Sequence, residues 1–297
     1  MFIPLENTLW QATGLFQTLS HKRPKVLRGL RTRGLIPRVS FLTGFIVIPT
    51  AFAEGLSVVE IMERNYQVNR THDRCNELTM TMYSKHGKKR VRKLRATALV
   101  MENGDEKRLI RFLYPPDIEG TGFLVHEHKG RDDDMWLYLP TLRKSRRKLS
   151  SNKKESFLGT EFSYGDIVGP KVEEYKYTLK GEEEIEGVNC YVIEAIPKSK
   201  DVLKDYGYSK RIDYIRKDNF TRHKAIFYDK HGKLLKTLYC SDPVEVDPKN
   251  HKWFVRYREM VNHQNGRKTI LVFDEIKVNI GLKEHFFTVR YLERGYE

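Results

Sequence analysis

The feature that most constrains the fold is a change of hydrophobic period near residue 70. Apolar residues recur with helical spacing between 56 and 70, in LSVVEIMERNYQVNR. Beyond this segment apolar residues alternate with polar ones, as in half-buried β-strands. Gly, Asn and Asp interrupt the alternating runs at short intervals, at 85–87, 102–105, 229–232 and 264–266. Strands joined by such short turns are antiparallel neighbours, because a parallel crossover needs a dozen or more residues.

The alternation predicts a mainly β fold with few helices, in which about eleven strands form one antiparallel sheet. A meander of that length curls strongly. Many strands have one apolar face and one face rich in Arg, Lys, Thr and Glu, so one side of the sheet faces water and the other is covered. Little chain is left to cover it, namely the helix at 56–70 and the loops at 149–169 and 197–208. We therefore expect an apolar cavity, with a second packed sheet as the alternative.

The N-terminal residues have the three parts of a secretory signal peptide. Residues 21–38 include seven Lys and Arg and no acid, and residues 39–53 are an uncharged apolar run of fifteen that ends in Ala-Phe-Ala. A membrane-spanning helix needs about 20 apolar residues, so we predict cleavage before Glu54 and export to the periplasm, with an uncleaved anchor as the alternative. Residues 1–20 have no role in this signal and indicate an extension or a misassigned start.

The charge of the exported chain limits its partners. The full chain has a formal net charge of +15, from 54 basic and 39 acidic residues. Residues 1–53 contain seven Lys or Arg and one acid, so the exported chain has 47 basic and 38 acidic residues, or +9. Outside the cytoplasm such a protein meets anionic lipid rather than nucleic acid. Of its three cysteines, Cys75, Cys190 and Cys240, at least one is a free thiol, and one disulfide of unspecified pairing is possible.

The segment SFLGTEFSYGDI at 156–167 closely resembles the signature of the LolA-like outer-membrane lipoprotein-sorting family. Further matches follow the order and spacing of that family over nearly all of the exported chain: GTGFL at 120–124, WLYLP at 136–140, LRK at 142–144, Lys236, FT at 287–288 and YLER at 291–294. Each match is weak alone, and together they are specific. The sequence departs from the family at position 165, where Gly stands in place of a frequent acid, and in its long N-terminal extension.

The resemblance implies an unclosed antiparallel β-barrel with a helical or loop lid, formed by residues 54–297 as one domain. It also implies a periplasmic carrier whose apolar cavity binds the lipid part of a lipoprotein, or another lipid. Such a carrier hands its cargo between envelope partners without covalent chemistry. Relatives of this kind often accompany RND-type exporters, which implies an inner-membrane RND-type transporter as a partner. The alternative is an accessory protein that docks on such an exporter and is not an enzyme.

Alternation along the strands assigns candidate residues to the cavity wall. They are Leu78, Met80, Met82, Ile110, Phe112, Met135, Leu137, Leu139, Trp253, Val255 and Tyr257. A second set forms a candidate lid or gate, with an ordinary covering loop as the alternative. Its members are Phe157, Leu158, Gly159, Phe162, Tyr164 and Asp166. We expect Asp166 to cap a helix or to pair with a nearby cation at the rim of the barrel.

Five cations, here called the basic cluster, follow directly on an apolar strand. They are Arg143, Lys144, Arg146, Arg147 and Lys148. We expect the strand to reach the rim of the barrel at Pro140, so that the basic cluster lies at or beside the mouth. Either it is a solvated edge strand whose charges prevent aggregation, or it docks anionic head groups or an acidic partner, since each cation near an anionic surface contributes about 1 kcal/mol.

The sequence lacks the common catalytic motifs, with no G-x-S-x-G, no Gly-rich phosphate loop and no H-E-x-x-H. His126 and His128 would share one face of a strand, but two ligands without a third make a weak metal site. Asp132 to Asp134 is better explained as a hairpin turn. We therefore predict no catalytic residue, no metal and no cofactor. A barrel filled by its own side chains would instead indicate an envelope-interaction protein that binds no lipid.

The signal-peptide prediction is tested by N-terminal sequencing and intact mass of the exported protein. We expect Glu54 to be the first residue, because Ala51 and Ala53 provide the small side chains that a signal peptidase recognises. An exported product whose mass includes Met1 would contradict the prediction.

Overall fold

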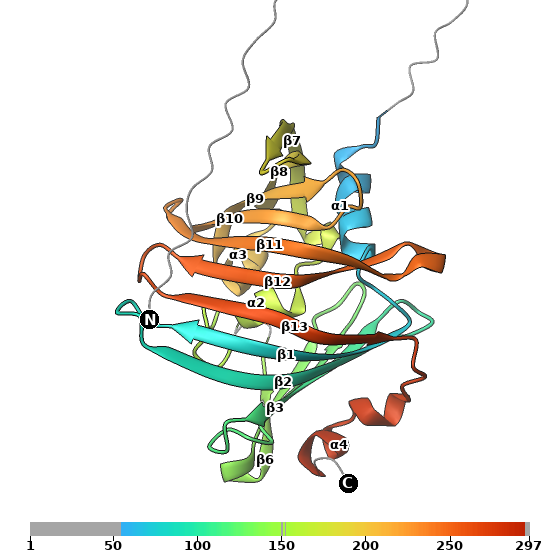
Figure 1. The fold of residues 1–297 in the computed structure, drawn as a ribbon, viewed down its shortest axis with the longest axis vertical. Coiled ribbons are helices and arrows are strands. Elements are labelled where there is room, and N and C mark those ends of the chain that lie inside the picture. Colours follow the sequence, from blue (N-terminus) through green and yellow to red (C-terminus); the bar gives the residue numbers. More distant parts are fainter. Residues whose placement is uncertain (1–54, 150, 152, 295–297) are drawn as a thin grey trace, which may run out of the picture. The chain divides into compact units, whose positions relative to one another are not determined.

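The computed structural model describes residues 55–149, 151 and 153–294. The predicted signal peptide, its cleavage position before Glu54 and the extension at 1–20 lie outside the described residues. Within the described ranges the chain forms thirteen β-strands and four short α-helices (Figure 1).

The bounds of these elements follow the chain order. The strands are β1 Asp73–Tyr83, β2 Lys89–Val100, β3 Glu106–Tyr114, β4 Gly122–Glu127, β5 Asp134–Leu139, β6 Lys144–Lys148, β7 Tyr175–Ile185, β8 Val188–Pro197, β9 Tyr208–Arg216, β10 Arg222–Asp229, β11 Leu234–Asp247, β12 Lys252–Asn262 and β13 Lys268–Val278. The α-helices are α1 Val58–Gln67, α2 Tyr164–Val168, α3 Lys200–Tyr206 and α4 Val289–Arg294. Short 3₁₀ turns are η1 Pro140–Leu142, η3 Val172–Glu174, η4 Pro248–Asn250 and η5 Glu284–Phe287.

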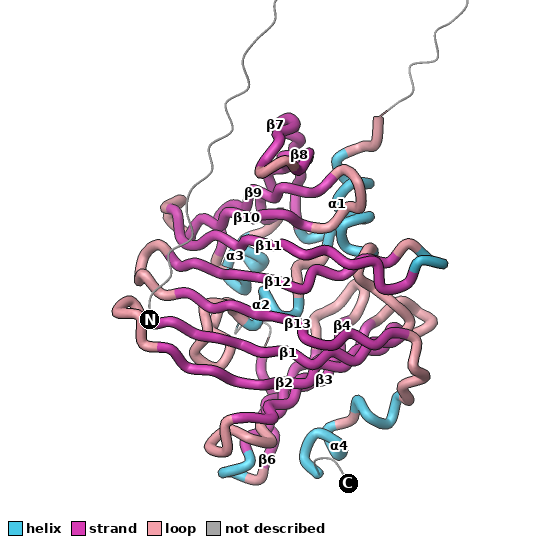
Figure 2. The backbone as a smooth tube through the Cα atoms, viewed as in Figure 1, coloured by secondary structure: helices cyan, strands magenta, loops and turns pink. Residues whose placement is uncertain are grey.

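All thirteen strands form one antiparallel sheet in the order β6-β5-β4-β3-β2-β1-β13-β12-β11-β10-β9-β8-β7. The edge strands β6 and β7 do not pair with each other in the described part of the chain, so the sheet curls without closing (Figure 2). The predicted fold class, a curled and unclosed β-barrel with a helical lid, is confirmed. Two more strands are present than the eleven expected. Edge strands are hard to recognise in the sequence because apolar and polar residues need not alternate in them; β6, for example, is Lys-Ser-Arg-Arg-Lys and has no apolar residue.

The predicted hairpin turns connect neighbouring strands. Gly87, Gly104, Gly232 and Gly266 have φ angles of 77°, 82°, 77° and 68°. Glycine is favoured there because it has no Cβ to clash in the left-handed region. The four turns join β1 to β2, β2 to β3, β10 to β11 and β12 to β13, as the sequence predicted.

A capping box starts α1. Ser57 Oγ accepts a hydrogen bond from the N–H of Glu60 (3.2 Å), and the Glu60 carboxylate accepts one from the N–H of Ser57 (2.8 Å). The predicted helix at 56–70 is therefore confirmed, although it is shorter at both ends. Ile61 and Met62 form its buried face and pack in one cluster with side chains of β8 and β9. No helix in the described ranges is both long and apolar enough to cross a membrane.

Residues 153–174, here called the link, run from β6 to β7 and cover much of the inner face of the sheet. The link contains α2 and η3. Its Phe157 is fully buried, and the Phe157 ring centroid lies 6.1 Å from Phe112, 5.5 Å from Phe123 and 5.3 Å from Tyr164. These strand and link side chains belong to one core cluster. The link therefore fills the side of the barrel next to β3, β4 and β5.

Two buried lysines anchor the link to the turn between β4 and β5. Lys153 Nζ lies 2.8 Å and Lys171 Nζ 3.1 Å from the carboxylate of Asp133. Lys171 Nζ also donates to the carbonyls of His128 and Arg131, both at 2.6 Å. Burial alone would raise the pKa of Asp133, but the two lysines lower it. One of the three aspartates predicted to form a turn, Asp133, thus also holds the link in place.

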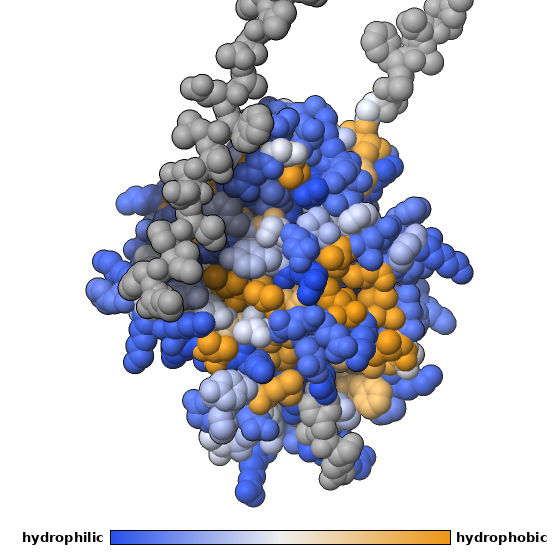
Figure 3. Space-filling view, in the orientation of Figure 1, coloured by the Kyte–Doolittle hydropathy of each residue, from blue (hydrophilic) through white to orange (hydrophobic). Residues whose placement is uncertain are grey.

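The outer face of the sheet is covered only in part. Phe287 and Leu292, from the C-terminal turn and α4, are buried against Leu99, Leu109 and Leu124 of β2, β3 and β4. On the face that Figure 3 shows, hydrophobic side chains gather among hydrophilic ones that surround them. The predicted water-facing side of the sheet is therefore of mixed character.

The packing of the link leads to a prediction about stability. Replacing Phe157 with Ala should lower the free energy of unfolding by about 3–5 kcal/mol, because the ring is fully buried among aromatic neighbours. Urea unfolding followed by tryptophan fluorescence measures the difference. Leu142→Ala is the control, since Leu142 is 48% exposed and its loss should change the free energy by less than about 0.5 kcal/mol. Equal effects of the two substitutions would show that the link is not part of the core.

Candidate functional site

A cavity of about 240 Å³ lies inside the curled sheet, lined by α1, α2 and residues of β1, β2, β3, β7, β9, β10, β12 and β13. A single water needs only about 10–15 Å³ of such space. A second hollow of about 130 Å³ shares Phe162, Asp166 and Arg258 with the first among its lining residues. The two spaces therefore adjoin and form one candidate binding region.

One wall of the cavity is apolar. It is formed by Leu78, Met80, Leu94, Ala96, Ile110 and Leu271. Phe254 and Phe273 lie at one end of it, with ring centroids 4.8 Å apart and an interplanar angle of 81°. Aliphatic and aromatic side chains of this kind provide a surface for a hydrocarbon chain.

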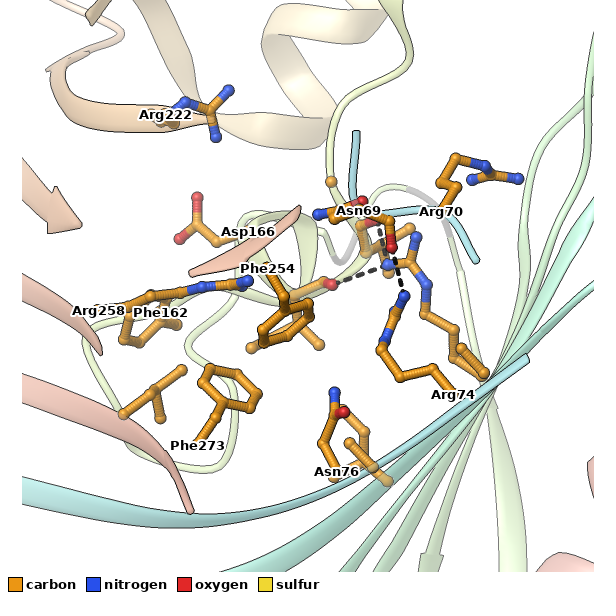
Figure 4. A pocket seen from close by; sticks show the side chains of 18 of the residues that line it. Asn69, Arg70, Arg74, Asn76, Phe162, Asp166, Arg222, Phe254, Arg258 and Phe273 are labelled. Carbon is orange, nitrogen blue, oxygen red and sulfur yellow. Dashed lines mark hydrogen bonds between the residues drawn. The ribbon is translucent and has the colours of Figure 1, made fainter. Parts of the chain in front are cut away.

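The remaining wall is strongly basic, which the sequence analysis did not predict. Six arginines line the two spaces: Arg70, Arg74, Arg108, Arg211, Arg222 and Arg258. Figure 4 shows Arg258 and Phe162 on one side of the view, with Arg70 and Arg74 on the other side. In the sequence, the one sign of this basic wall was that Arg258 follows directly on Tyr257, a residue predicted to point inward. Strand alternation had assigned Tyr257, and not Arg258, to the cavity wall.

Three of these arginines surround one buried carboxylate, that of Glu106. The shortest distances from Glu106 oxygens are 2.6 Å to Arg108 Nε, 2.7 Å to Arg70 Nη1 and 3.6 Å to Arg74 Nη2. Burial would raise the pKa of Glu106, but the three guanidinium groups together lower it to about 2. Glu106 therefore stays ionised inside the barrel at any ordinary pH.

A second carboxylate, Glu127, ties the end of α1 to the sheet. Its oxygens lie 3.0 Å from Arg108 Nη2 and 3.3 Å from Arg70 Nη1, and Tyr66 of α1 donates its hydroxyl hydrogen to it. Burial raises the pKa of the Tyr66 hydroxyl above its ordinary value. These contacts fix α1, the first part of the lid, over the arginine wall.

Asp166 holds α2, the second part of the lid. Its carboxylate accepts from the N–H of Ser163 (2.7 Å) in a capping box, and it lies 2.5 Å from Lys236 Nζ. The Tyr208 hydroxyl donates to it as well (3.0 Å). Although burial opposes the charged amine, the nearby Asp166 carboxylate raises the pKa of Lys236. Asp166 therefore caps a helix, as expected, but its cation is Lys236 of β11 rather than one of the basic cluster.

The structure explains the glycine at position 165. A Cβ added to Gly165 would lie 2.7 Å from Cδ1 of Tyr206 and 3.3 Å from the carbonyl oxygen of Lys153. Tyr206 is buried and belongs to the main core cluster. Its ring takes the space that an acidic side chain at 165 would need.

The predicted cavity-wall residues fall into three groups. Leu78, Met80 and Ile110 line the larger space, and Trp253 and Val255 line the smaller one. The rest of the sheet residues do not line either space: Met82, Phe112, Met135, Leu137 and Leu139 pack in or against the main core, and Tyr257 donates its hydroxyl hydrogen to Glu259. The link explains the core-packed group, because its Phe157 and Tyr164 belong to the same core cluster as these strand residues.

The six predicted lid residues are part of the link, and they are packed rather than free. Phe157, Phe162 and Asp166 line the cavity, and Tyr164 is buried in the core. Leu158 packs against the same core, and Gly159 follows it with a φ of 82°.

The basic cluster does not line either space. Arg143 follows η1, and Lys144, Arg146, Arg147 and Lys148 are on the edge strand β6. Two of its members have partners, Arg147 with Asp134 and Lys148 with Glu155 (2.8 Å). The candidate rim residues are thus brought together, at a sheet edge rather than around the cavity.

Comparison with known proteins gives two relatives at 32% identity. One is a domain described as that of an outer membrane lipoprotein-sorting protein from Vibrio parahaemolyticus, with a TM-score of 0.73 over 80% of this chain and 98% of that one. The other is a DUF1329 family protein from Desulfovibrio piger, with the same TM-score over 79% of this chain and 97% of that one. A LolA superfamily protein from Nitrosomonas europaea, 18% identical, shares the fold with a TM-score of 0.61 over 80% of this chain and all of that one.

The family of this chain follows from the family model and the two relatives at 32% identity. A model of a family described as an uncharacterized protein matches residues 104–294, and no curated protein matches the chain. The family match covers more than half of the sequence, and the two relatives at 32% identity are covered almost end to end. This chain therefore belongs to the outer-membrane lipoprotein-sorting protein family, with DUF1329 proteins among its relatives.

Proposed function

We propose that residues 54–297 form a single lipid-carrier domain that works in the periplasm. The domain encloses an acyl chain of a lipoprotein or of another lipid and passes it between envelope partners, without covalent chemistry. The observation that supports this function best is the cavity inside the unclosed barrel, with its wall of aliphatic side chains. The relative whose description names lipoprotein sorting supports the class of cargo and the location in the cell envelope.

The size of the cavity suits part of an acyl chain. Each buried methylene contributes about 0.8 kcal/mol, so about ten would contribute roughly 8 kcal/mol, equivalent to micromolar binding before ordering costs. Met62 and Met80 line the space. Their unbranched side chains adapt to ligands of different shape. Binding of this strength suits a carrier, because the cargo has to leave again.

The lid offers a route for release. α2 has only five residues, and one carboxylate, that of Asp166, connects it to Lys236 and Tyr208. Arg108 of β3 also donates to the carbonyls of Ile167 (3.1 Å) and Val168 (2.6 Å) in α2. A partner that separates α2 from both Lys236 and Arg108 would expose the cavity. The buried pair would have to be separated at a cost of about 3–5 kcal/mol, which keeps the lid shut in the absence of that partner.

A substitution that fills the cavity tests the proposed function. Ala96→Phe should abolish uptake of a fluorescent fatty-acyl probe, since Ala96 lies on the apolar wall and a phenyl ring there occupies the ligand's space. Probe fluorescence is titrated with the purified, delipidated protein. The matched control is Thr79→Phe on the neighbouring strand β1. Thr79 does not line the cavity, and its hydroxyl donates a hydrogen bond to the exposed Asp274. Unchanged uptake by Ala96→Phe would contradict the proposed site.

A second function, docking through the basic cluster, has one observation in its favour. Arg143, Lys144, Arg146 and Arg147 are exposed on or beside a sheet edge. An exposed edge of this charge suits an anionic membrane surface or an acidic partner. An RND-type transporter remains a partner suggested by the resemblance.

Vesicle binding tests this second function. Changing Arg143, Arg146 and Arg147 to Glu should weaken binding to vesicles that contain anionic phospholipid at least tenfold, because each cation near the surface contributes about 1 kcal/mol. Binding of the unchanged protein should also fall as salt rises. The control changes Lys88, Lys89 and Arg90 to Glu, which gives the same net charge on an exposed part of the β1–β2 hairpin. Equal losses in both variants would show a general charge effect without a docking site.

A further inference from the structure

The most unusual side chain in the cavity is Arg258 of β12. It lines both spaces, and its guanidinium group makes no hydrogen bond or ion pair with any described residue. Its guanidinium carbon lies 5.0 Å from the ring centroid of Phe254 and 4.9 Å from that of Phe273. The two aromatic faces hold the guanidinium group in place, but they leave its N–H donors without an acceptor.

The cations near Arg258 have too few carboxylates to neutralise them. Burial lowers the pKa of Arg258, and the nearby charges of Arg222 and Arg108 lower it further. Arg222 Nε lies 2.9 Å from the carboxylate of Asp213, but Asp213 also receives a hydrogen bond from Arg211 Nε at 2.7 Å. One carboxylate is therefore shared by two guanidinium groups. The buried Nη2 of Arg211 has no acceptor in the described residues.

The charges around the cavity add up to an excess of cations. The basic groups are the six lining arginines together with Lys236, which gives +7. The acids in contact with them are Glu106, Glu127, Asp166 and Asp213, which gives −4. The difference is +3. Asp166, the only acid among the described residues that line the two spaces, is already paired with Lys236.

An excess of positive charge in a partly enclosed site is costly unless an anion neutralises it. The apolar wall of Leu78, Met80 and Leu271 adjoins the arginines in the same cavity. A ligand that suits both parts has a hydrocarbon chain and an anionic head. An acyl chain held by an ester or amide, as in a lipoprotein, offers the chain without the charge.

We propose that this cavity binds an anionic single-chain lipid, whose carboxylate or phosphate oxygens accept hydrogen bonds from Arg258 and pair with Arg222, while its chain lies along the apolar wall. This inference rests on the proposed carrier function and narrows its cargo. Arg258 is the side chain that distinguishes an anionic lipid from a neutral lipid of equal length. Arg70, Arg74 and Arg108 are already paired with Glu106, so they contribute mainly to the positive electrostatic potential of the cavity.

Calorimetric titration of the purified, delipidated full chain with three probes of equal chain length tests the proposal. The probes are dodecanoate, dodecyl phosphate and dodecanol, each below its aggregation concentration. We expect at least one of the two anions to bind ten or more times more tightly than dodecanol. In Arg258→Met that preference should fall at least tenfold, while dodecanol binding stays the same or improves. Arg256→Met is the control, since Arg256 is on the same strand but contacts Asp242 (3.7 Å) and the carbonyl of Phe273 (3.2 Å).

The possible outcomes separate the two proposals. Equal binding of dodecanol and both anions, or full anion preference in Arg258→Met, would overturn the anion site and leave the carrier function standing. Absence of binding by any probe would overturn both. Preference for only one anion identifies the head group, carboxylate or phosphate. The urea midpoint of Arg258→Met without ligand should be unchanged or higher, because an unpaired charge is removed; a clear decrease would show that Arg258 is a structural residue instead.

Discussion

The structure depends on one constraint, that a sheet which does not close must have its inner face covered by its own chain. The link meets this constraint with three buried ion pairs: Lys153 and Lys171, near its two ends, bind Asp133, and Asp166, between them, binds Lys236. These contacts hold Phe157 and Tyr164 in the core and leave α2 beside an unfilled space. The cavity exists because the link fills only one side of the barrel.

The two sides of the cavity have different chemical character, and this follows from how the lid is attached. α1 is fixed by arginines that bind Glu106 and Glu127, so the attachment itself brings cations into the barrel. Strands β1, β2 and β13 supply the hydrocarbon surface opposite them. A site built in this way favours amphipathic molecules, because a purely apolar ligand would leave the arginine side without partners.

Sequence patterns predicted the fold well and the site only in part. The helix at 56–70 and the hairpin turns depend on local spacing and local backbone geometry, and both were correct. The cavity wall depends on which inward residues the link covers, and no strand pattern contains that information for Met135 or Leu137. Arg258 was missed for another reason: strand alternation was assigned from the apolar residues, and an inward arginine has the polarity expected of the outer face.

The three cysteines have a consequence for how this protein matures. Cys75, Cys190 and Cys240 are all described, all unpaired, and located on β1, β8 and β11, no two of which are neighbours in the sheet. Burial raises the pKa of each thiol, that of Cys190 to about 11. Reactive thiolate is therefore scarce at neutral pH. A chain that folds in an oxidising compartment would thus reach its native state without an oxidase or a disulfide isomerase, and it should fold equally well where thiols are kept reduced.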